Sequence, residues 1–540
     1  MKRLNLKPGL FSLLVLAFSS AYAQNDFEFV ADIRTPEGGS MPQYFTEYDG
    51  KLYFNAYDDI HGQELWVTDG TGGGTQLLMD INEGTGGGNP NFLTVMNHML
   101  YFTAYDPVTG GQLWKTNGTP AGTGAIIGGD SFNNPYYLTV YKDRLYFSAF
   151  DNTHGNELWV SDGSAGGTRM VKDINTRTDM GNGRTDDGSP SRFIVYNNLL
   201  YFAANDGVNG NELWVTDGTE IGTHMVKDIN PGKGSSALIY PTVFGDKMYF
   251  RATDGTNGDE LWVTNGSEGG TKLFMEFSAG ANSGAPQDLV VVNNKMFFGA
   301  TNSTGYGFWV SDGTVEGTVM LKQIRLCFFG DDKRHIAAFN DKVYFRADDG
   351  FYGDELWASG GTPGGTQMVK DIYPGIYGGC QFKYTAVYNN KLYFSGNDDN
   401  YSESLWVTDG TTADTKRIAP NTAQSPLQST SGFIVFKGSL FFAANYDERS
   451  LELWKLTTVP SGIPVHNVAE PVVYPSPAKS FIRLAGAAGE LYYNIISADG
   501  KVVLSGETVD NDIFTIDVSG LKAGTYLLRT KNLHSLFMKE

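Results

Sequence analysis

The stretch Glu64–Thr71 reads Glu-Leu-Trp-Val-Thr-Asp-Gly-Thr, and the same eight letters return at Glu212–Thr219. Weaker copies of this motif surround each of the remaining tryptophans of the chain. The nine tryptophans are Trp66, Trp114, Trp159, Trp214, Trp262, Trp309, Trp357, Trp406 and Trp454, and successive ones lie 45 to 55 residues apart. Such regular spacing of the rarest large side chain indicates a tandem structural unit. We therefore interpret residues 24–458 as one array of nine repeats.

Each repeat contains four short segments with the composition of β-strands. In the first repeat these segments cover residues 44–48, 51–57, 64–68 and 76–81, and turns rich in Asp, Gly and Thr separate them. Four short antiparallel strands per repeat are typical of one blade of a β-propeller. The chain has 67 glycines, and 13% of its residues are aromatic, which also favours an all-β protein.

The turn between the first two strands supports this division. Its central pairs are Asp49-Gly50, Asn97-His98, Lys142-Asp143, Asn197-Asn198, Gly245-Asp246, Asn293-Asn294, Asn340-Asp341, Asn389-Asn390 and Lys437-Gly438. Asn, Asp and Gly tolerate the positive φ that two-residue hairpins require. The following strand carries consecutive apolar residues such as Leu52-Tyr53-Phe54, which indicates burial on both faces. A blade packed between two neighbours meets that requirement, whereas a two-sheet sandwich would leave one face in water.

The two ends of the array predict how it closes. Residues 27–33 (FEFVADI) match the fourth strand of other repeats, and the ninth repeat stops after its third strand at Trp454. An extra outer strand at the front and a missing one at the back fit a ring that the N-terminal strand closes. We predict nine four-stranded blades. Eight blades with a degenerate unit, or two smaller rings, are the alternatives, because most propellers have four to eight blades.

The motif resembles the ELWxxDGT repeat of secreted bacterial proteins, and the resemblance covers residues 25–458. Near copies stand at 157–164, 260–267, 355–362 and 405–411, whereas the sixth repeat departs with Gly307-Phe308-Trp309. The resemblance implies a repeat family of poorly defined biochemical role. It supplies no catalytic residue.

The first 23 residues have the features of a secretory signal. Lys2, Arg3 and Lys7 precede an apolar stretch over 11–18, and Ala21-Tyr22-Ala23 is a small-x-small cleavage site, which places cleavage between Ala23 and Gln24. The apolar stretch is too short for a stable membrane anchor, and we expect no transmembrane segment elsewhere. Without residues 1–23 the chain has 37 basic and 60 acidic residues, a net charge of −23. This charge disfavours nucleic acid and anionic membranes as partners.

The composition changes after Trp454. A Pro-containing linker over 459–470 leads into residues 471–540, whose short strands and Gly turns predict a small antiparallel β-sandwich. Tyr474-Pro475-Ser476-Pro477, the segment 493–503 and Gly524-Thr525-Tyr526 resemble the type A C-terminal sorting domain of type IX secretion. The resemblance implies that residues 471–540 engage the type IX secretion machinery. The protein would then be secreted, and it would be extracellular or bound to the outer-membrane surface after both ends are processed.

Most residues that could carry chemistry recur with the repeat, which favours structural roles. The motif Glu is present in six repeats, and we expect it to pair with fourth-strand lysines such as Lys227. The Asp of Asp-Gly-Thr is expected to accept backbone N–H groups. Loops with an Asp-x-x-x-Gly pattern, as at Asp58, are interpreted as plain turns. Calcium is the alternative there, although the EF-hand spacing is absent, and we expect no other cofactor and no metal site.

The two cysteines, Cys327 and Cys380, lie in successive connections between repeats, so a disulfide and two free thiols are both open interpretations.

A ligand is expected at the loops that vary between repeats. In a propeller the loops between strands two and three share one face with the connections between blades, and variable loops are where binding concentrates. The candidate residues are Asp179, Arg184, Asp186 and Asp187 in one connection, and Arg325, Phe328, Phe329, Asp331, Asp332 and Arg334 in another. We predict a surface binding or adhesion protein, without assigned catalytic residues, whose partner is a glycan, a matrix polymer or a surface protein. A secreted carbohydrate-active enzyme, a glycosidase or lyase, is the alternative.

Overall fold

The computed structural model describes residues 24–34, 38–127, 131–178, 185–327, 335–397, 403–419, 428–446, 449–459, 472–474, 479–485, 491–497, 501–508, 513–530 and 534–539. Within these residues every element is a strand except one 3-10 helix, η1 (Pro120–Gly122). The predicted all-β class is confirmed. Contacts divide the chain into two units, of which one is Gln24–Val459 and the other includes Pro460–Glu540.

In the part of Gln24–Val459 that the structure describes, the strands form nine antiparallel sheets, which we number in chain order. Sheet 1 contains β2 (Gln43–Tyr48), β3 (Lys51–Asp58), β4 (Gly62–Thr68) and β5 (Gln76–Met79); sheet 2 contains β6 (Asn91–Met96), β7 (Met99–Asp106), β8 (Gly110–Thr116) and β9 (Gly124–Ala125); sheet 3 contains β10 (Asn133–Tyr141), β11 (Arg144–Asp151), β12 (Gly155–Ser161) and β13 (Arg169–Lys172). Sheet 4 contains β14 (Ser191–Tyr196), β15 (Leu199–Asn205), β16 (Asn211–Thr216) and β17 (His224–Lys227); sheet 5 contains β18 (Ile239–Phe244), β19 (Lys247–Thr253), β20 (Asp259–Thr264) and β21 (Lys272–Met275); sheet 6 contains β22 (Gln287–Val292), β23 (Lys295–Asn302), β24 (Gly305–Ser311) and β25 (Val319–Lys322).

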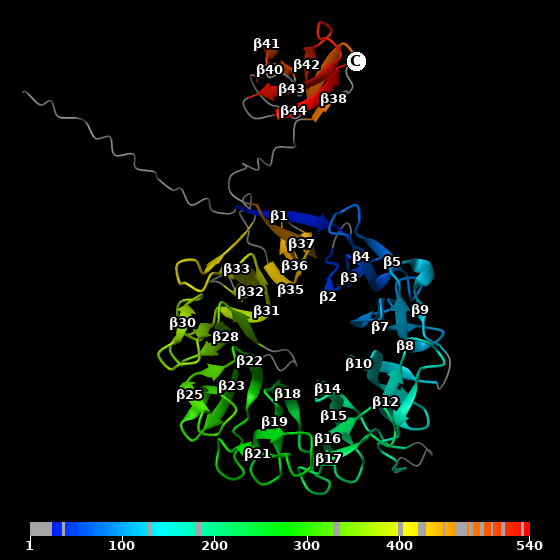
Figure 1. Cartoon of the computed structure of the whole chain (residues 1–540), viewed down its shortest axis with the longest axis vertical. Coiled ribbons are helices and arrows are strands. Elements are labelled where there is room, and N and C mark those ends of the chain that lie inside the picture. Colours follow the sequence, from blue (N-terminus) through cyan, green and yellow to red (C-terminus); the bar gives the residue numbers. More distant parts are fainter. Residues whose placement is uncertain are drawn as a thin grey trace, which may run out of the picture. The chain divides into compact units, whose positions relative to one another are not determined.

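Sheet 7 has five strands, β26 (Arg325–Leu326), β27 (Ile336–Phe339), β28 (Lys342–Asp348), β29 (Asp354–Ser359) and β30 (Thr366–Lys370); sheet 8 contains β31 (Cys380–Tyr388), β32 (Lys391–Asn397), β33 (Glu403–Thr408) and β34 (Lys416–Arg417). Sheet 9 combines β35 (Gln428–Phe436), β36 (Ser439–Tyr446) and β37 (Arg449–Val459) with the N-terminal strand β1 (Gln24–Ala31). Figure 1 shows these sheets following one another around a central opening, from blue to orange. First strands of neighbouring sheets contact one another, for example β2 with β6 and β2 with β35, so the first strands border the opening.

The turns between first and second strands have the expected backbone. Both central residues take a positive φ in eight of the nine turns, for example Asn197 (46°) and Asn198 (57°). In the remaining turn only Gly245 does so, with φ 61°. These values are those of the mirror-image turns whose twist matches that of paired strands. The prediction of two-residue hairpins at these positions is confirmed.

The tryptophans hold the same place in every sheet, opposite a second-strand phenylalanine. Trp214 pairs with Phe202, and the corresponding pairing recurs in the other eight sheets. The apolar core lies between sheets. Between sheets 4 and 5, for instance, Leu213 of one sheet packs with Phe250 and Trp262 of the next. Each sheet is therefore apolar on both faces, as its consecutive apolar residues predicted.

Sheet 9 joins the two ends of this unit. Strand β1 pairs antiparallel with β37, with Phe27 opposite Leu456 and Phe29 opposite Trp454. Phe441 of sheet 9 shares a buried cluster with Phe54 of sheet 1. The last sheet thus packs against the first in the same way as other neighbours pack.

The C-terminal unit contains two small antiparallel sheets in its described residues. One has the order β38 (Val472–Tyr474), β39 (Phe481–Ala485), β42 (Ile513–Asp517), and the other the order β41 (Val502–Thr508), β40 (Leu491–Ser497), β43 (Gly524–Thr530), β44 (His534–Lys539). Ile495, Ile516 and Leu528 from both sheets are buried.

Candidate functional site

The recurring glutamate of the motif holds the connection that leaves its own sheet. Glu212 is fully buried, and its carboxylate accepts the backbone N–H groups of Ile229 (2.9 Å), Asn230 (3.3 Å) and Ser236 (3.0 Å). The same arrangement recurs at Glu64 with Asn82 and Gly88, Glu157 with Ile174, Asn175 and Gly188, Glu260 with Phe277, Ser278 and Gly284, Glu355 with Ile372, Tyr373 and Gly379, and Glu452 with Ile33 and Ser40. We call these six residues the glutamate clamps. Each accepts backbone N–H groups of the connection, which lie outside the strands.

Glu452 shows that the N-terminal segment serves as a connection. Its carboxylate accepts N–H groups from Ile33 and Ser40, as well as the Ser40 hydroxyl at 2.5 Å. These residues follow β1, just as the partners of Glu212 follow β17. The chain start therefore replaces the missing last part of the ninth repeat.

Burial governs the protonation of the clamps. It raises the pKa of Glu64, Glu212, Glu355 and Glu452 to about 7 and that of Glu157 to about 9, while the backbone N–H bonds act in the opposite direction. Desolvation disfavours the charged form of an acid, and here it outweighs the bonds.

The expected pairing of the glutamates with lysines is wrong. Lys227 lies opposite Leu213 in the register, so it does not share a face with Glu212, because adjacent residues of a strand project to opposite faces. The Lys227 ammonium instead donates to the carbonyl of Thr271 in sheet 5 at 2.9 Å. A sequence signal for the true partners exists: Gly88, Ser236, Gly284 and Gly379 stand 24 residues after their glutamates.

The Asp-Gly-Thr turn is structural, as expected. Asp217 accepts the backbone N–H of Thr219 at 2.8 Å and its hydroxyl at 2.7 Å, and the hydroxyl bond is the main cause that lowers the pKa of Asp217. Gly218 has φ 99° and lies against the hydroxyl of Tyr146 from the preceding sheet. A Cβ at Gly218 would stand 2.3 Å from that oxygen. Glycine is needed here for both its φ and its size.

The loops with Asp-x-x-x-Gly use the carboxylate to hold their own backbone. Asp58 accepts the N–H groups of Ile60 (2.9 Å) and His61 (2.6 Å) through one oxygen, and its other oxygen lies 2.8 Å from Nδ1 of His61. Asp151 and His154 repeat this pairing. Burial raises the pKa of Asp58, but the bonds from His61 outweigh it and hold the pKa below its usual value. Within the described residues, no cluster of three His, Cys, Asp or Glu has the arrangement of a metal site. Calcium stays an untested alternative.

The structure places only part of the predicted ligand face. Asp186 and Asp187 lie in the connection before sheet 4, where Asp187 accepts the N–H of Asn156 at 3.0 Å and the Asp186 N–H donates to Arg177. Arg325 is exposed on β26 and forms an ion pair with Asp348 at 3.0 Å. The first connection joins sheets 3 and 4 and the second joins sheets 6 and 7, and no contact among the described residues brings them together. The other candidates, Asp179, Arg184, Phe328, Phe329, Asp331, Asp332 and Arg334, lie outside the described residues.

Cys327 and Cys380 are both free thiols in the structure. The Cys327 thiol donates to the carboxylate of Asp354, and burial raises its pKa to about 12. Cys380 is 1% exposed on β31. A thiol whose pKa is raised is a poor nucleophile at neutral pH. We assign neither cysteine a chemical role.

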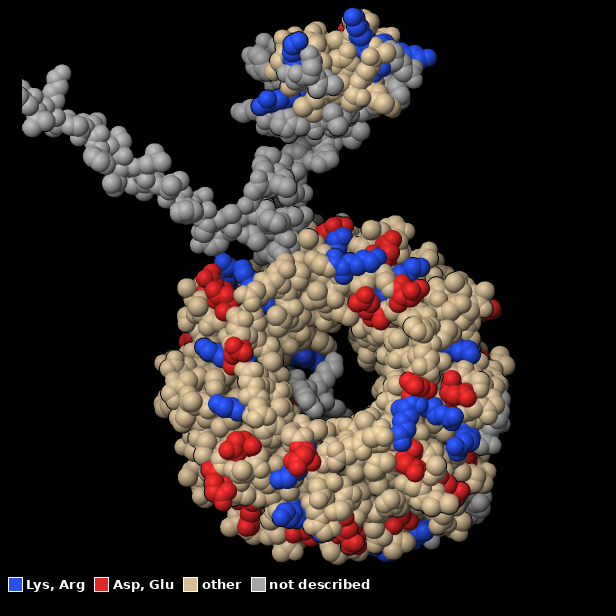
Figure 2. Space-filling model, in the orientation of Figure 1, with Lys and Arg blue, Asp and Glu red and all other residues tan. Residues whose placement is uncertain are grey.

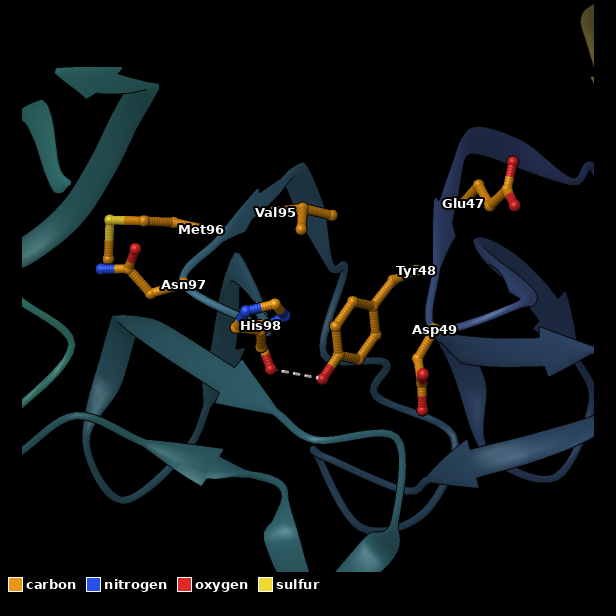
Figure 3. Close-up of a pocket in the computed structure, with 7 residues that line it drawn as sticks. All are labelled: Glu47, Tyr48, Asp49, Val95, Met96, Asn97 and His98. Atoms are coloured by element: carbon orange, nitrogen blue, oxygen red, sulfur yellow. Dashed lines mark hydrogen bonds between the residues drawn. The ribbon is translucent and has the colours of Figure 1, made fainter.

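A shallow cavity of about 740 Å³ lies between the first hairpins of sheets 1 and 2 (Figure 3). Glu47, Tyr48 and Asp49 line one side of it, and residues 95–98 line the other. The Tyr48 hydroxyl crosses the gap and donates to the carbonyl of His98 at 2.7 Å. The same tie recurs from Tyr141 to Asn198 and from Tyr388 to Gly438. This cavity is therefore one copy of a repeated contact between sheets.

Comparisons with known proteins identify the C-terminal unit. Residues 472–539 match the family described as the secretion system C-terminal sorting domain. No curated protein matches the chain. In the part of the chain that the structure describes, no helix has the length and hydropathy to cross a membrane.

Solved structures show only distant likenesses. PorZ, a surface component of the type IX secretion system of Porphyromonas gingivalis, is 12% identical and covers 93% of this chain and 75% of its own, with a TM-score of 0.33. A prolyl endopeptidase is 11% identical over 66% of this chain and 55% of its own, with a TM-score of 0.35. A puromycin-hydrolysing peptidase of Mycobacterium tuberculosis is 10% identical over 66% of this chain and 57% of its own, with a TM-score of 0.36. At these TM-scores the likenesses carry no argument about function. The family match is specific, and it makes residues 472–539 a type IX secretion sorting domain, which indicates secretion and attachment at the cell surface.

Proposed function

We propose that this protein is a cell-surface binding or adhesion protein that type IX secretion exports. The sorting domain at 472–539 is the observation that carries the proposal, because it assigns the export route. The part ahead of it would be the exported cargo, and residues 1–23 would be a signal peptide that is removed before Gln24. The resemblance to ELWxxDGT repeat proteins agrees with a secreted chain.

The cargo in this proposal is a nine-bladed β-propeller closed by its N-terminal strand. Its support is the pairing of β1 with β37, the cluster that joins Phe441 to Phe54, and the clamp from Glu452 to Ser40. Each of these contacts has counterparts in other repeats, such as the pairing of β16 with β17 and the clamp from Glu212 to Ser236. A closed ring leaves no apolar sheet face uncovered at its two ends, which suits a protein that stays outside the cell.

Binding is favoured over catalysis by the use of the recurring acids. The glutamate clamps and the aspartates of the turns are occupied by backbone donors of their own loops, as at Glu212 and Asp217. Such groups position loops. The loops they position differ in length, with 31 residues between Glu157 and its partner Gly188 against 24 between Glu212 and Ser236. Variable loops on a fixed scaffold are the usual arrangement of a recognition surface.

The export half of the proposal is tested by truncation in cells. A chain that lacks residues 472–539 is expected to remain inside the outer membrane, where added proteinase K does not reach it, whereas the full chain is digested on intact cells. A control with Glu540 removed alone should behave as the full chain. Surface exposure of the truncated chain would contradict the export route. N-terminal sequencing of the surface form should begin at Gln24.

The binding half is tested on the purified protein. The surface form is screened against immobilised glycans, matrix polymers and cell-envelope fractions, and any hit is re-measured with Asp179→Ala/Arg184→Ala and with Arg325→Ala. Larger deletions in this connection are unsuitable because Gly188 belongs to the clamp of Glu157. Weaker binding in at least one variant is expected. Unchanged binding in both variants would remove the connections from the proposal, and release of reducing ends from a bound glycan would favour a carbohydrate-active enzyme.

A further inference from the structure

Most of the first strands begin with a bulge whose backbone is strained. In sheet 1, Gln43 pairs with Asn55 and Thr46 pairs with Tyr53, so Tyr44 and Phe45 have no ladder partner between them. At the bulge the φ angles are positive: 59° at Tyr44, 52° at Phe92, 62° at Tyr137, 59° at Arg192, 55° at Tyr240, 53° at Asp288 and 67° at Gly432. Positive φ is unfavourable for bulky residues, and bulges re-aim side chains next to functional sites.

The bulge does not itself need a side chain. Gly432 lies four residues before Phe436, the last residue of β35 in sheet 9. Tyr137 has the same position in sheet 3, four residues before Tyr141, the last residue of β10. Glycine adopts this φ without steric cost, whereas tyrosine does not. An aromatic residue at this position therefore lowers the stability of the fold, and sheet 9 escapes this strain because it has glycine there. Strain of this kind points to a role of the side chain outside folding.

Sheets 1, 2 and 3 place the aromatic residues Tyr44, Phe92 and Tyr137 at this position, where Phe92 is half-buried, and Tyr136 directly precedes Tyr137. Tyr44 is 46% exposed, Tyr136 47% and Tyr137 44%. The ring of Phe92 lies 6.0 Å from that of Tyr136 and 5.9 Å from that of Tyr137, both edge-on, so the cluster spans the first strands of sheets 2 and 3. We call Tyr44, Phe92, Tyr136 and Tyr137 the aromatic rim. A group of exposed rings of this kind marks a binding surface.

The rim lies beside the central opening, on the side that carries the connections. First strands border the opening, and the bulge is at the start of each strand, directly after the connection and away from the hairpin turn. Polar amides flank the rings: Gln43 and Asn134 are exposed beside Tyr44 and Tyr136. In the view of Figure 2, uncharged residues form most of the border of the opening.

We propose that the aromatic rim binds a glycan by stacking uncharged pyranose rings on Tyr44, Phe92, Tyr136 and Tyr137. The faces of pyranoses carry C–H groups of slight positive charge, which match the negative face of an aromatic ring. The adjacent amides of Gln43 and Asn134 supply donors and acceptors for sugar hydroxyls. An uncharged polysaccharide is favoured over a polyanionic one because the protein without residues 1–23 has a net charge of −23. This inference rests on the proposed function and assigns it a ligand class and a site.

The test uses one variant that removes a ring without adding strain. Tyr137→Gly reproduces the residue found at position 432, so its melting temperature should equal or exceed that of the original chain. Tyr136→Ala removes the second exposed ring, and Tyr306→Ala is the matched control, because Tyr306 is 53% exposed on β24 of sheet 6, away from the rim. Binding is measured by isothermal calorimetry and affinity electrophoresis with laminarin, mannan and xylan. Alginate and a polyproline peptide are the competing probes.

At least one uncharged polysaccharide is expected to bind, and Tyr137→Gly and Tyr136→Ala should each weaken it by about tenfold, whereas Tyr306→Ala should not. Binding that both rim variants leave unchanged would overturn the rim as the site while the proposed function stands. Rim-dependent binding of polyproline or alginate in place of uncharged polysaccharides would overturn the ligand class. Failure of all polysaccharides to bind, with surface display intact, would overturn the inference without touching the export route.

Discussion

Replacement of Glu212 by alanine is the most direct test of the glutamate clamps. The substitution leaves the backbone N–H groups of Ile229 and Asn230 without the carboxylate acceptor, whereas the N–H of Ser236 keeps its bond to the carbonyl of Asn211. The residues Ile229 and Ser236 are at most 2% exposed, so water does not readily replace the carboxylate. An orphaned buried donor costs about 1–3 kcal/mol, and the two together predict a loss of about 2–6 kcal/mol in the free energy of unfolding. Glu403→Ala is the control, because Glu403 is in no clamp and its side chain is partly exposed.

The titration of Glu212 gives a second, independent estimate of its effect on the free energy of unfolding. Burial raises the pKa of Glu212 to about 7 in the folded protein, against 4.5 for an ordinary glutamate. A carboxyl with a raised folded pKa binds its proton more tightly in the folded state. Its contribution is complete below about pH 4.5 and is lost as the pH rises through 7. The shift corresponds to about 3 kcal/mol between pH 4.5 and pH 8.5.

Urea unfolding at pH 5.0 and pH 8.5 measures both effects. The original chain is expected to be less stable at pH 8.5, and Glu212→Gln, which cannot titrate, should reduce that difference by up to about 3 kcal/mol. Two results would refute the reasoning: a loss below about 1 kcal/mol for Glu212→Ala, or a pH dependence that Glu212→Gln leaves intact. The first would mean that the clamp bonds are replaceable by water, and the second that burial does not control this carboxyl.

Two further predictions concern the contacts between sheets. Gly218→Ala forces a Cβ into a residue with φ 99° and to within 2.3 Å of the Tyr146 hydroxyl, so the melting temperature should fall by several degrees, and a second change, Tyr146→Phe, should recover part of the loss. A chain without residues 24–31 leaves the outer edge of β37 unpaired and is expected to be less soluble and to form dimers or larger species in size-exclusion chromatography, whereas a monomer of unchanged melting temperature would contradict the role of β1.

The sequence predicted local structure well because the same turn residues and the same apolar runs recur in each of the nine repeats. Two-residue hairpins require a positive φ that Asn and Gly tolerate, as at Asn197-Asn198, and consecutive apolar residues such as those at 52–54 require two covered faces. Both requirements act over a few residues, and nine copies of each make the pattern legible. The sorting domain was recognisable for a similar reason, since its motifs stand in a fixed order over 471–540.

The partners of the glutamate clamps could be found only in three dimensions. Glu212 and Ser236 are 24 residues apart in the chain, and the bond between them depends on where the connection turns back over the sheet. The expected pairing of Glu212 with Lys227 is wrong because the strand register puts Lys227 opposite Leu213, on the other face of the sheet from Glu212. A buried carboxylate accepts hydrogen bonds from nearby donors that lie outside the strands, and here these donors are backbone N–H groups.

The sequence by itself determined that the chain is an all-β array of tandem units followed by a separate sorting domain, because strand period, turn chemistry and repeat length are local properties. Only the tertiary structure decided that Glu452 holds the N-terminal segment, and that Tyr44, Phe92 and Tyr137 stand at the same bulge of neighbouring sheets. These residues are far apart in the chain. Their proximity follows from how neighbouring sheets pack around the opening, which sequence spacing alone does not specify.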